Sequence, residues 1–149
     1  RVTLPVSPTT EVVATMPVEP TTSTSLRGRI LLVDDEELIL RVLSLMLSGS
    51  HEIITTSAAA EALALCTAGE RYDLILCDLM MPHMTGMDLH RELARVAPDQ
   101  ASRMIFLTGG AFTPAAQQFL ADGSREYIEK PFDTANLRAV IQRHLRGNP

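Results

Sequence analysis

The sequence predicts an α/β fold, in which a parallel sheet of five strands carries helices on both faces. Five short apolar runs alternate along the chain with five segments of helical period. The stretches between successive runs are too long for hairpins and suit crossover helices, which connect parallel strands. A chain of 149 residues is long enough to bury one sizeable core, so we expect a single such domain.

The predicted strands are the apolar runs at 30–33, 52–55, 74–77, 104–107 and 126–128. In the segments between and after them, apolar residues recur three or four positions apart, which places them on one face of a helix. These residues are Leu38, Ile39, Val42, Leu43 and Met46; Ala59, Ala62, Leu63 and Cys66; Leu89, Leu93 and Val96; Ala115, Ala116, Phe119 and Leu120; and Leu137, Val140, Ile141 and Leu145. Cys66 and the strand residue Cys77 are not spaced for a metal site, so we expect both to be small core residues.

Residues 1–28 differ in composition from the rest of the chain. They contain four of the nine prolines, repeated threonine and serine, and few charges, which is typical of a linker. Within them, residues 1–5 alternate like a strand, and the alternatives are the last strand of a preceding domain and an unstructured tail. Because the chain begins with Arg1 rather than methionine, we expect a fragment or a processed product, with the folded domain at 29–149.

Charge and hydropathy argue against two classes of partner. The net charge is −5, the wrong sign for a surface that follows a phosphate backbone, so we expect no direct contact with nucleic acid. No apolar run approaches the roughly 18 residues of a membrane-spanning helix, and no basic-then-apolar signal begins the sequence. We therefore expect a cytoplasmic chain without direct membrane contact.

Charged and polar side chains follow four of the predicted strands. Asp34 and Asp35 follow the first strand, Asp78 the third, Thr108 the fourth and Lys130 the fifth. In a parallel sheet these positions gather at one edge, beyond the carboxyl ends of the strands. Two carboxylates about 5 Å apart repel each other by roughly 3 kcal/mol at an effective dielectric near 20, so such a cluster calls for a cation. Oxygen ligands without histidine or thiolate favour Mg²⁺.

Each of these residues also has an ordinary structural interpretation. Asp34 and Asp35 suit a helix amino terminus, Asp78 suits a turn, and Thr108 suits a β-branched strand position. Capping does not explain an aspartate that ends an apolar strand. Lys130 is the only lysine in the chain, and a proline follows it. We therefore expect a cis bond to that proline, which would direct the ammonium over the strand ends.

Four motifs stand in order at the ends of the predicted strands, at 32–36 (LVDDE), 76–82 (LCDLMMP), 107–109 (LTG) and 127–132 (YIEKPF). Together they resemble the receiver domain of two-component response regulators, over residues 29–146. The resemblance implies a flavodoxin-like, doubly wound (βα)5 fold with strand order 2-1-3-4-5. It also implies a domain that takes a phosphoryl group from a phosphohistidine and changes conformation to signal in a phosphorelay.

The resemblance implies that Asp78 is the phosphoryl acceptor and that Mg²⁺ is the cofactor. The ion would be held by Asp34, Asp35, Asp78 and the backbone carbonyl of Met80. The donor would be a histidine kinase or a histidine phosphotransfer domain. The physical argument agrees, because phosphoryl transfer depends mainly on positioning and on neutralisation of charge.

The same resemblance implies roles in binding and switching for three further residues. Thr108 would donate a hydrogen bond to the phosphoryl group, and Lys130 would form an ion pair with it. Tyr127 would be an aromatic switch that moves inward when Thr108 shifts. A domain of this kind catalyses its own Mg²⁺-dependent phosphorylation and dephosphorylation.

A narrower resemblance concerns the parent protein. Residues 1–5 resemble the closing strand of a histidine kinase ATPase domain, and residues 108–112 (TGGAF) resemble receivers at the carboxyl end of hybrid kinases. We therefore expect the carboxyl-terminal receiver of a hybrid sensor histidine kinase, with no DNA-binding module after the last helix. Formation of a homodimer through the last two helices stays open.

Three other functions share parts of this pattern. A flavodoxin-like electron carrier needs a first loop that binds phosphate, and the acidic loop at 34–36 would repel one. A haloacid-dehalogenase-like phosphatase would carry a second aspartate two residues after the nucleophile, where this chain has Met80. A non-phosphorylated, receiver-like interaction module remains the alternative. Such modules typically lack one of the acidic pair, the acceptor or the lysine, all of which are present here.

Overall fold

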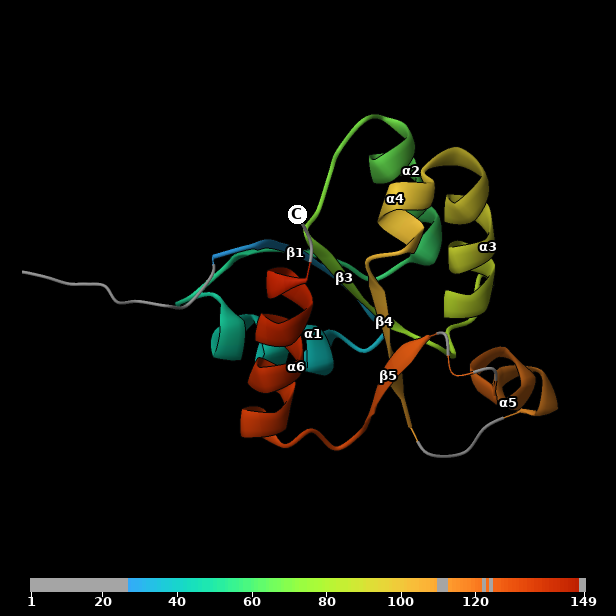
Figure 1. The fold of residues 1–149 in the computed structure, drawn as a ribbon. Coiled ribbons are helices and arrows are strands. Elements are labelled where there is room, and N and C mark those ends of the chain that lie inside the picture. Colours follow the sequence, from blue (N-terminus) through green and yellow to red (C-terminus); the bar gives the residue numbers. More distant parts are fainter. Residues whose placement is uncertain (1–26, 110–112, 122, 124, 148–149) are drawn as a thin grey trace, which may run out of the picture.

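The computed structural model describes residues 27–109, 113–121, 123 and 125–147. A parallel sheet of five strands runs through it in the order β2-β1-β3-β4-β5 (Figure 1). The strands are β1 (Arg29–Val33), β2 (Glu52–Thr56), β3 (Leu74–Asp78), β4 (Met104–Thr108) and β5 (Glu126–Glu129). The helices are α1 (Glu37–Leu47), α2 (Ala59–Thr67), α3 (Gly86–Val96), α4 (Pro98–Ala101), α5 (Pro114–Ala121) and α6 (Thr134–Arg146). The predicted fold class and strand order are confirmed.

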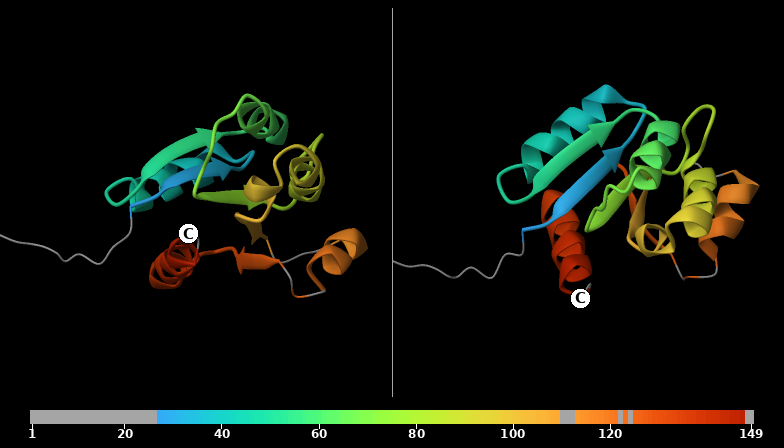
Figure 2. Two further views of the ribbon diagram at one scale, coloured as in Figure 1. Left: turned by 45° about the horizontal axis from the view of Figure 1, so that its top comes forward. Right: turned by 90° about the horizontal axis from the view of Figure 1, so that it is seen from above.

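The helices form a layer on each face of the sheet (Figure 2). Helices α1 and α6 cover one face, and α2, α3, α4 and α5 cover the other. Successive residues of a strand point to opposite faces. Ile30 and Leu32 therefore pack with α1 and α6, whereas Leu31 and Val33 pack with the helices of the other layer. Strands β3 and β4 are buried along their whole length, because they lie inside the sheet and are covered on both faces.

The buried face of α1 differs in part from the predicted one, since Leu43 is buried and Ile39 and Met46 pack against the core as predicted. Leu40, Leu43 and Leu47 are buried, whereas Leu38 and Val42 are exposed. Most residues of α1 are apolar on every side of the helix, so their spacing does not select the face that packs on the sheet.

Helix α4 is a single turn that the apolar pattern does not predict. It begins at Pro98, and a proline in the first turn of a helix lacks an N–H that would have no partner there anyway. Val96 and Ala115, which we expect on buried faces, are exposed because they lie in the last turn of α3 and the first turn of α5. Cys66 and Cys77 are buried free thiols in the core, as predicted.

The predicted linker falls mostly outside the described residues, which begin at Arg27. Gly28 leads into β1, where its N–H donates to His51 Nδ1 at 3.0 Å and its carbonyl accepts from Glu52 N–H at 2.9 Å. The boundary at residue 29 stays a prediction, as does the strand at 1–5. In the described part of the chain, no helix is both long enough and apolar enough to cross a membrane.

Candidate functional site

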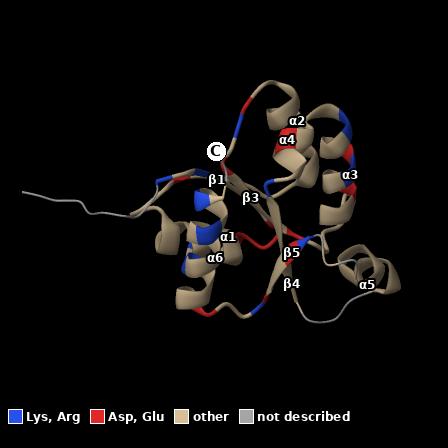
Figure 3. Ribbon diagram, in the orientation of Figure 1, with Lys and Arg blue, Asp and Glu red and all other residues tan. Residues whose placement is uncertain are grey.

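Two buried carboxylates lie side by side where β1 and β3 end. Asp34 directly follows β1 and is fully buried, and Asp78 is the last residue of β3 and is 6% exposed. The two strands are neighbours, with Val33 paired to Cys77. Asp35 is exposed, and one carboxylate oxygen from each of the three aspartates lies within 4.8 Å of the others. Acidic positions at this end of the sheet lead into α1 (Figure 3).

Backbone hydrogen bonds fix both segments that carry the buried carboxylates. Asp34 N–H donates to the Thr56 carbonyl at 3.3 Å, and Glu36 N–H donates to Asp34 Oδ1 at 2.9 Å. Met80 N–H donates to Asp78 Oδ1 at 3.3 Å. One oxygen of each buried carboxylate is therefore held by the loop that follows its strand, which leaves the second oxygen for another partner.

A glycine that the sequence pattern does not single out shapes the loop after Asp78. A Cβ atom on Gly86 would lie 2.5 Å from the Asp78 carbonyl oxygen, so a side chain there would displace the end of β3. Gly86 N–H donates to the Leu79 carbonyl at 3.0 Å, and a capping box formed by Thr85 and Asp88 starts α3 at this point. The spacing of the capping box is the signal in the sequence that could reveal this turn.

Lys130 reaches the cluster from the loop after β5. Its ammonium Nζ lies 3.0 Å from Asp34 Oδ2, 3.5 Å from Glu36 Oε1 and 3.8 Å from Asp78 Oδ2. The bond from Lys130 to the following proline is cis, as predicted. Among the described residues, this ammonium is the cation that lies within ion-pair distance of the two buried aspartates.

Burial and crowding shift the pKa values of these groups. Burial, together with the neighbouring Asp34 charge, raises the pKa of Asp78 from 3.8 to about 7. Burial also raises the pKa of Asp34, against the opposing effect of its hydrogen bonds from Glu36 N–H and Lys130. Burial opposes the charged form of Lys130, but the hydrogen bond to Asp34 and the charge of Asp78 outweigh it and raise the pKa of the ammonium. One ammonium therefore faces more negative charge than it can neutralise.

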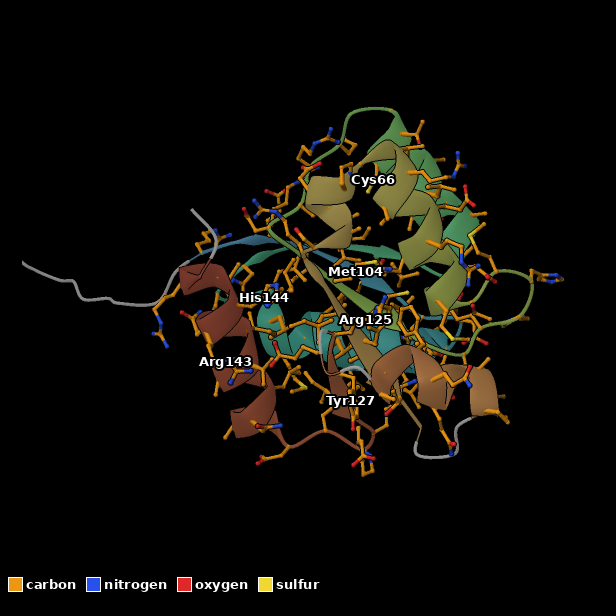
Figure 4. The ribbon with its side chains drawn as sticks, turned by 45° about the vertical axis from the view of Figure 1, so that its right-hand side comes forward. Cys66, Met104, Arg125, Tyr127, Arg143 and His144 are labelled. Carbon is orange, nitrogen blue, oxygen red and sulfur yellow. The ribbon has the colours of Figure 1, made fainter. Side chains whose placement is uncertain are left out.

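Thr108 and Tyr127 lie on adjacent strands in different environments. Thr108 ends β4 and is 1% exposed, and its hydroxyl has no hydrogen-bond partner within the described residues. Lys130 N–H donates to the Thr108 carbonyl at 2.7 Å, which places the two residues side by side. A buried hydroxyl without a partner is costly, so a ligand oxygen would satisfy it. Tyr127, which Figure 4 labels, lies on β5 and is 43% exposed.

The donor atoms at this edge fit a hard divalent cation. Within the described ranges, Asp34, Asp35 and Asp78 form the one group of three or more side chains that could ligate a metal, and all their donors are oxygen. Carboxylate oxygens and water are the ligands that Mg²⁺ prefers. Met80 lies in the loop after Asp78 and is 37% exposed. Its backbone carbonyl as a further ligand stays a prediction.

A known family model matches most of the length of the chain. The family model of the response regulator receiver domain matches residues 30–142. The match covers all five strands except Arg29, the first residue of β1, and it includes all the aspartates of the cluster, together with Thr108 and Lys130.

Curated relatives agree with the family model. The uncharacterized transcriptional regulatory protein YkoG of Bacillus subtilis is 34% identical over 123 residues, which cover 82% of this chain and 53% of that protein. The DNA-binding response regulator MtrA of Mycobacterium tuberculosis is 34% identical over 126 residues, which cover 83% of this chain and 53% of that protein. The chain thus spans about half the length of these relatives.

Solved structures show the same fold. A response regulator receiver domain from Clostridium thermocellum is 30% identical, with a TM-score of 0.69 and coverage of 80% of this chain and 94% of that one. The receiver domain of a sensor histidine kinase from Pseudomonas aeruginosa, described with a magnesium ion coordinated in its active-site cleft, is 27% identical. Its TM-score is 0.70, with coverage of 82% of this chain and 100% of that one. This chain therefore belongs to the receiver domains of two-component response regulators.

Proposed function

We propose that Asp78 is the phosphoryl acceptor of this receiver domain and that Mg²⁺ is its cofactor. The observation that carries the proposal is the pair of buried carboxylates, Asp34 and Asp78, beside one ammonium and one unsatisfied hydroxyl. Buried like charges cost stability, so this arrangement is suited to a bound cation together with a bound anion. The magnesium ion described in the Pseudomonas receiver supports the choice of metal.

The proposed chemistry gives each residue a task. An Asp78 carboxylate oxygen attacks the phosphorus atom of a phosphohistidine, the phosphorus–nitrogen bond breaks, and the imidazole leaves and takes up a proton. Mg²⁺, held by the three aspartates and the Met80 carbonyl, would neutralise charge on the transferred group. Lys130 pairs its ammonium with one phosphoryl oxygen, and Thr108 donates its hydroxyl hydrogen to another.

The proposed switch uses the contrast between Thr108 and Tyr127. The buried Thr108 hydroxyl gains a partner when Asp78 is phosphorylated, so its side chain moves toward the phosphoryl group. Tyr127 then turns inward from its exposed position on β5. The register supports this coupling, because Tyr127 pairs with Phe106, two residues before Thr108 on the neighbouring strand.

Intact mass after exposure to acetyl phosphate and Mg²⁺ tests the proposal. We expect the parent protein to gain one phosphoryl group, and Asp78→Asn to gain none. Asp99→Asn, which removes an exposed carboxylate of α4, is the matched control and should gain one group like the parent. A phosphoryl group on Asp78→Asn would contradict the acceptor assignment. An unmodified parent would support the alternative, a non-phosphorylated interaction module.

We propose as well that the phosphodonor contacts the exposed apolar residues of α1. Leu38, Val42 and Leu45 are 68%, 41% and 76% exposed, and α1 starts directly after the acidic loop of the site. A histidine kinase or phosphotransfer partner that brings a phosphohistidine to Asp78 would cover this face. Leu45→Glu should therefore slow transfer from a phosphorylated partner and leave phosphorylation by acetyl phosphate unchanged. Equal slowing of both reactions would contradict this contact.

The parent protein has two candidate forms, both consistent with a cytoplasmic receiver. A hybrid sensor histidine kinase is our proposal, and the similarity to the Pseudomonas kinase receiver supports it. A DNA-binding regulator is the second candidate, because MtrA is named as a DNA-binding response regulator and YkoG as a transcriptional regulatory protein. The full-length reading frame distinguishes them. A kinase ATPase domain before residue 1 supports the first, and a DNA-binding domain after residue 149 supports the second.

A further inference from the structure

We propose that Glu36 restrains Lys130 and so sets how readily its ammonium moves to a phosphoryl group on Asp78. The inference rests on the proposed function and adds a positioning residue to it. Glu36 is the third acidic residue of the loop after β1, and it lies outside the cluster of aspartates that fits a metal ion.

The ammonium of Lys130 lies nearer to the loop after β1 than to the acceptor. Its distances to Asp34 and Glu36 are 3.0 and 3.5 Å, whereas its distance to Asp78 is 3.8 Å. Both nearer carboxylates belong to the segment between β1 and α1. The ammonium therefore donates hydrogen bonds to this segment, while it contacts Asp78 only as a longer ion pair.

A bound cation would change the balance between these two carboxylates. Asp34 is part of the cluster that fits the metal, so the ion would attract its charge and weaken its hold on Lys130. Glu36 keeps its charge for the ammonium. In the metal-loaded site, Glu36 is then the carboxylate that competes with a phosphoryl group on Asp78 for Lys130.

The backbone of Glu36 is fixed while its side chain is accessible. The N–H donates to Asp34 Oδ1 at 2.9 Å, and the carbonyl accepts from Leu40 N–H at 3.2 Å. The side chain forms no cap hydrogen bond at the start of α1 and is 63% exposed. Exposed ion pairs are weak, so a phosphoryl group on Asp78 can overcome the restraint on Lys130. Removal of the Glu36 charge should therefore raise the affinity for a phosphoryl mimic about two- to fivefold.

Glu36→Gln tests the inference, with Glu37→Gln as the matched control. Both variants remove one exposed negative charge, but Glu37 is not within ion-pair distance of Lys130. The probe is beryllofluoride, a phosphoryl mimic, titrated at saturating Mg²⁺. We expect Glu36→Gln to bind beryllofluoride about two- to fivefold more tightly than Glu37→Gln, with equal Mg²⁺ affinity in the two variants. Equal beryllofluoride affinity would overturn the inference.

A second measurement reads the ammonium directly. Because Lys130 is the only lysine, ¹⁵N-lysine labelling gives one side-chain Nζ signal. With Mg²⁺ bound, Glu36→Gln should shift this signal and Glu37→Gln should not. If the parent binds beryllofluoride and the signal is the same in both variants, Glu36 has no such role and the proposed function stands. If the parent fails to bind beryllofluoride with Mg²⁺, the proposed function falls and this inference with it.

Discussion

The two ends of the same sheet carry charge in opposite arrangements. At the amino ends of the strands, Arg29 pairs with Glu52 at 3.3 Å and with Glu70 at 2.8 Å, and its N–H donates to Asp73 at 2.8 Å. At the carboxyl ends, three aspartates gather within 4.8 Å around one ammonium. The paired carboxylates at the first end are accessible to water, with the Glu52 and Glu70 side chains 61% and 45% exposed, whereas the Asp34 and Asp78 side chains at the second end are 0% and 8% exposed.

Two buried polar side chains, Gln100 and Thr108, show a related contrast between the ends, while at the amino end of β5 His144 Nε2 is also buried without a hydrogen-bond partner among the described residues. Gln100 is 1% exposed near the amino ends, and its side chain accepts from Tyr72 N–H at 2.9 Å and donates to the Tyr72 carbonyl at 3.2 Å. The buried Thr108 hydroxyl at the carboxyl end has no such partner in the described part of the chain. The difference teaches that Gln100 stabilises the fold through its hydrogen bonds, whereas the buried polar groups at the carboxyl end cost stability and are suited to a ligand.

The largest expected effect comes from crowding the carboxyl end. Gly86→Ala should lower the free energy of unfolding by about 2–3 kcal/mol, because its methyl group meets the Asp78 carbonyl, a backbone atom that cannot move alone. Urea unfolding measures the change. Gly49→Ala is the control, since no atom lies within 4 Å of its added methyl, and should change stability by less than about 0.5 kcal/mol. Equal losses of stability in Gly86→Ala and Gly49→Ala would show that the closeness of Gly86 to the Asp78 carbonyl is not the cause.

A smaller loss of stability is expected from a change at the amino end, and it should leave the candidate site unaffected. Gln100→Ala should lower the free energy of unfolding by about 2 kcal/mol, because the buried Tyr72 backbone groups lose their partner. The stabilisation by Mg²⁺ should remain as in the parent protein. The exposed Gln117→Ala serves as the control for both measurements. Loss of the Mg²⁺ response in Gln100→Ala would show that the amino end is coupled to the candidate site.

Acidification should have the smallest effect, a loss of stability at the amino end. Burial, and then the charge of Arg27, lowers the pKa of His51 below 6.5, and its Nδ1 accepts from Gly28 N–H. The unfolded chain therefore takes up a proton more readily than the native one. The contribution of His51 is fully present above about pH 6.5 and is lost as pH falls through the lowered pKa.

Thermal unfolding of His51→Gln between pH 7 and pH 5 measures this contribution. The variant should lose less stability than the parent over that range, because its amide does not take up a proton. His83→Gln, in the exposed loop after β3, should follow the parent. An identical pH dependence in all three proteins would contradict the lowered pKa of His51, because a protonated Nδ1 cannot accept the hydrogen bond from Gly28.

The sequence is sufficient to predict the fold and the convergence of the main candidate residues. Strands β3 and β4 are recognisable as continuous apolar runs because helices cover both faces of the sheet there. The polar residue that ends each run marks the carboxyl end of the strand. Parallel topology then brings Asp34, Asp78, Thr108 and Lys130 to one end of the sheet. Their roles in binding and transfer stay proposals.

Three features of the structure cannot be predicted from the spacing of residues in the sequence. The buried face of α1 is not predictable because Leu38, Leu40 and Leu45 are equally apolar. The closeness of Gly86 to Asp78 is set by the return of the loop toward the end of β3. The contact of Glu36 with Lys130 depends on the direction of a long side chain.

The central claim is that the buried carboxylates are arranged for a cation and reduce stability without one. The free energy of unfolding of the parent protein and of Asp78→Asn, each in EDTA and in Mg²⁺, tests it most directly. In EDTA, Asp78→Asn should be the more stable protein by up to about 1 kcal/mol, because a neutral side chain removes the cost of burying a charge and the repulsion from Asp34. At about fivefold over its dissociation constant, Mg²⁺ should stabilise the parent by about 1 kcal/mol and the variant much less. A variant that is less stable than the parent in EDTA, with an equal response to Mg²⁺, would contradict the claim.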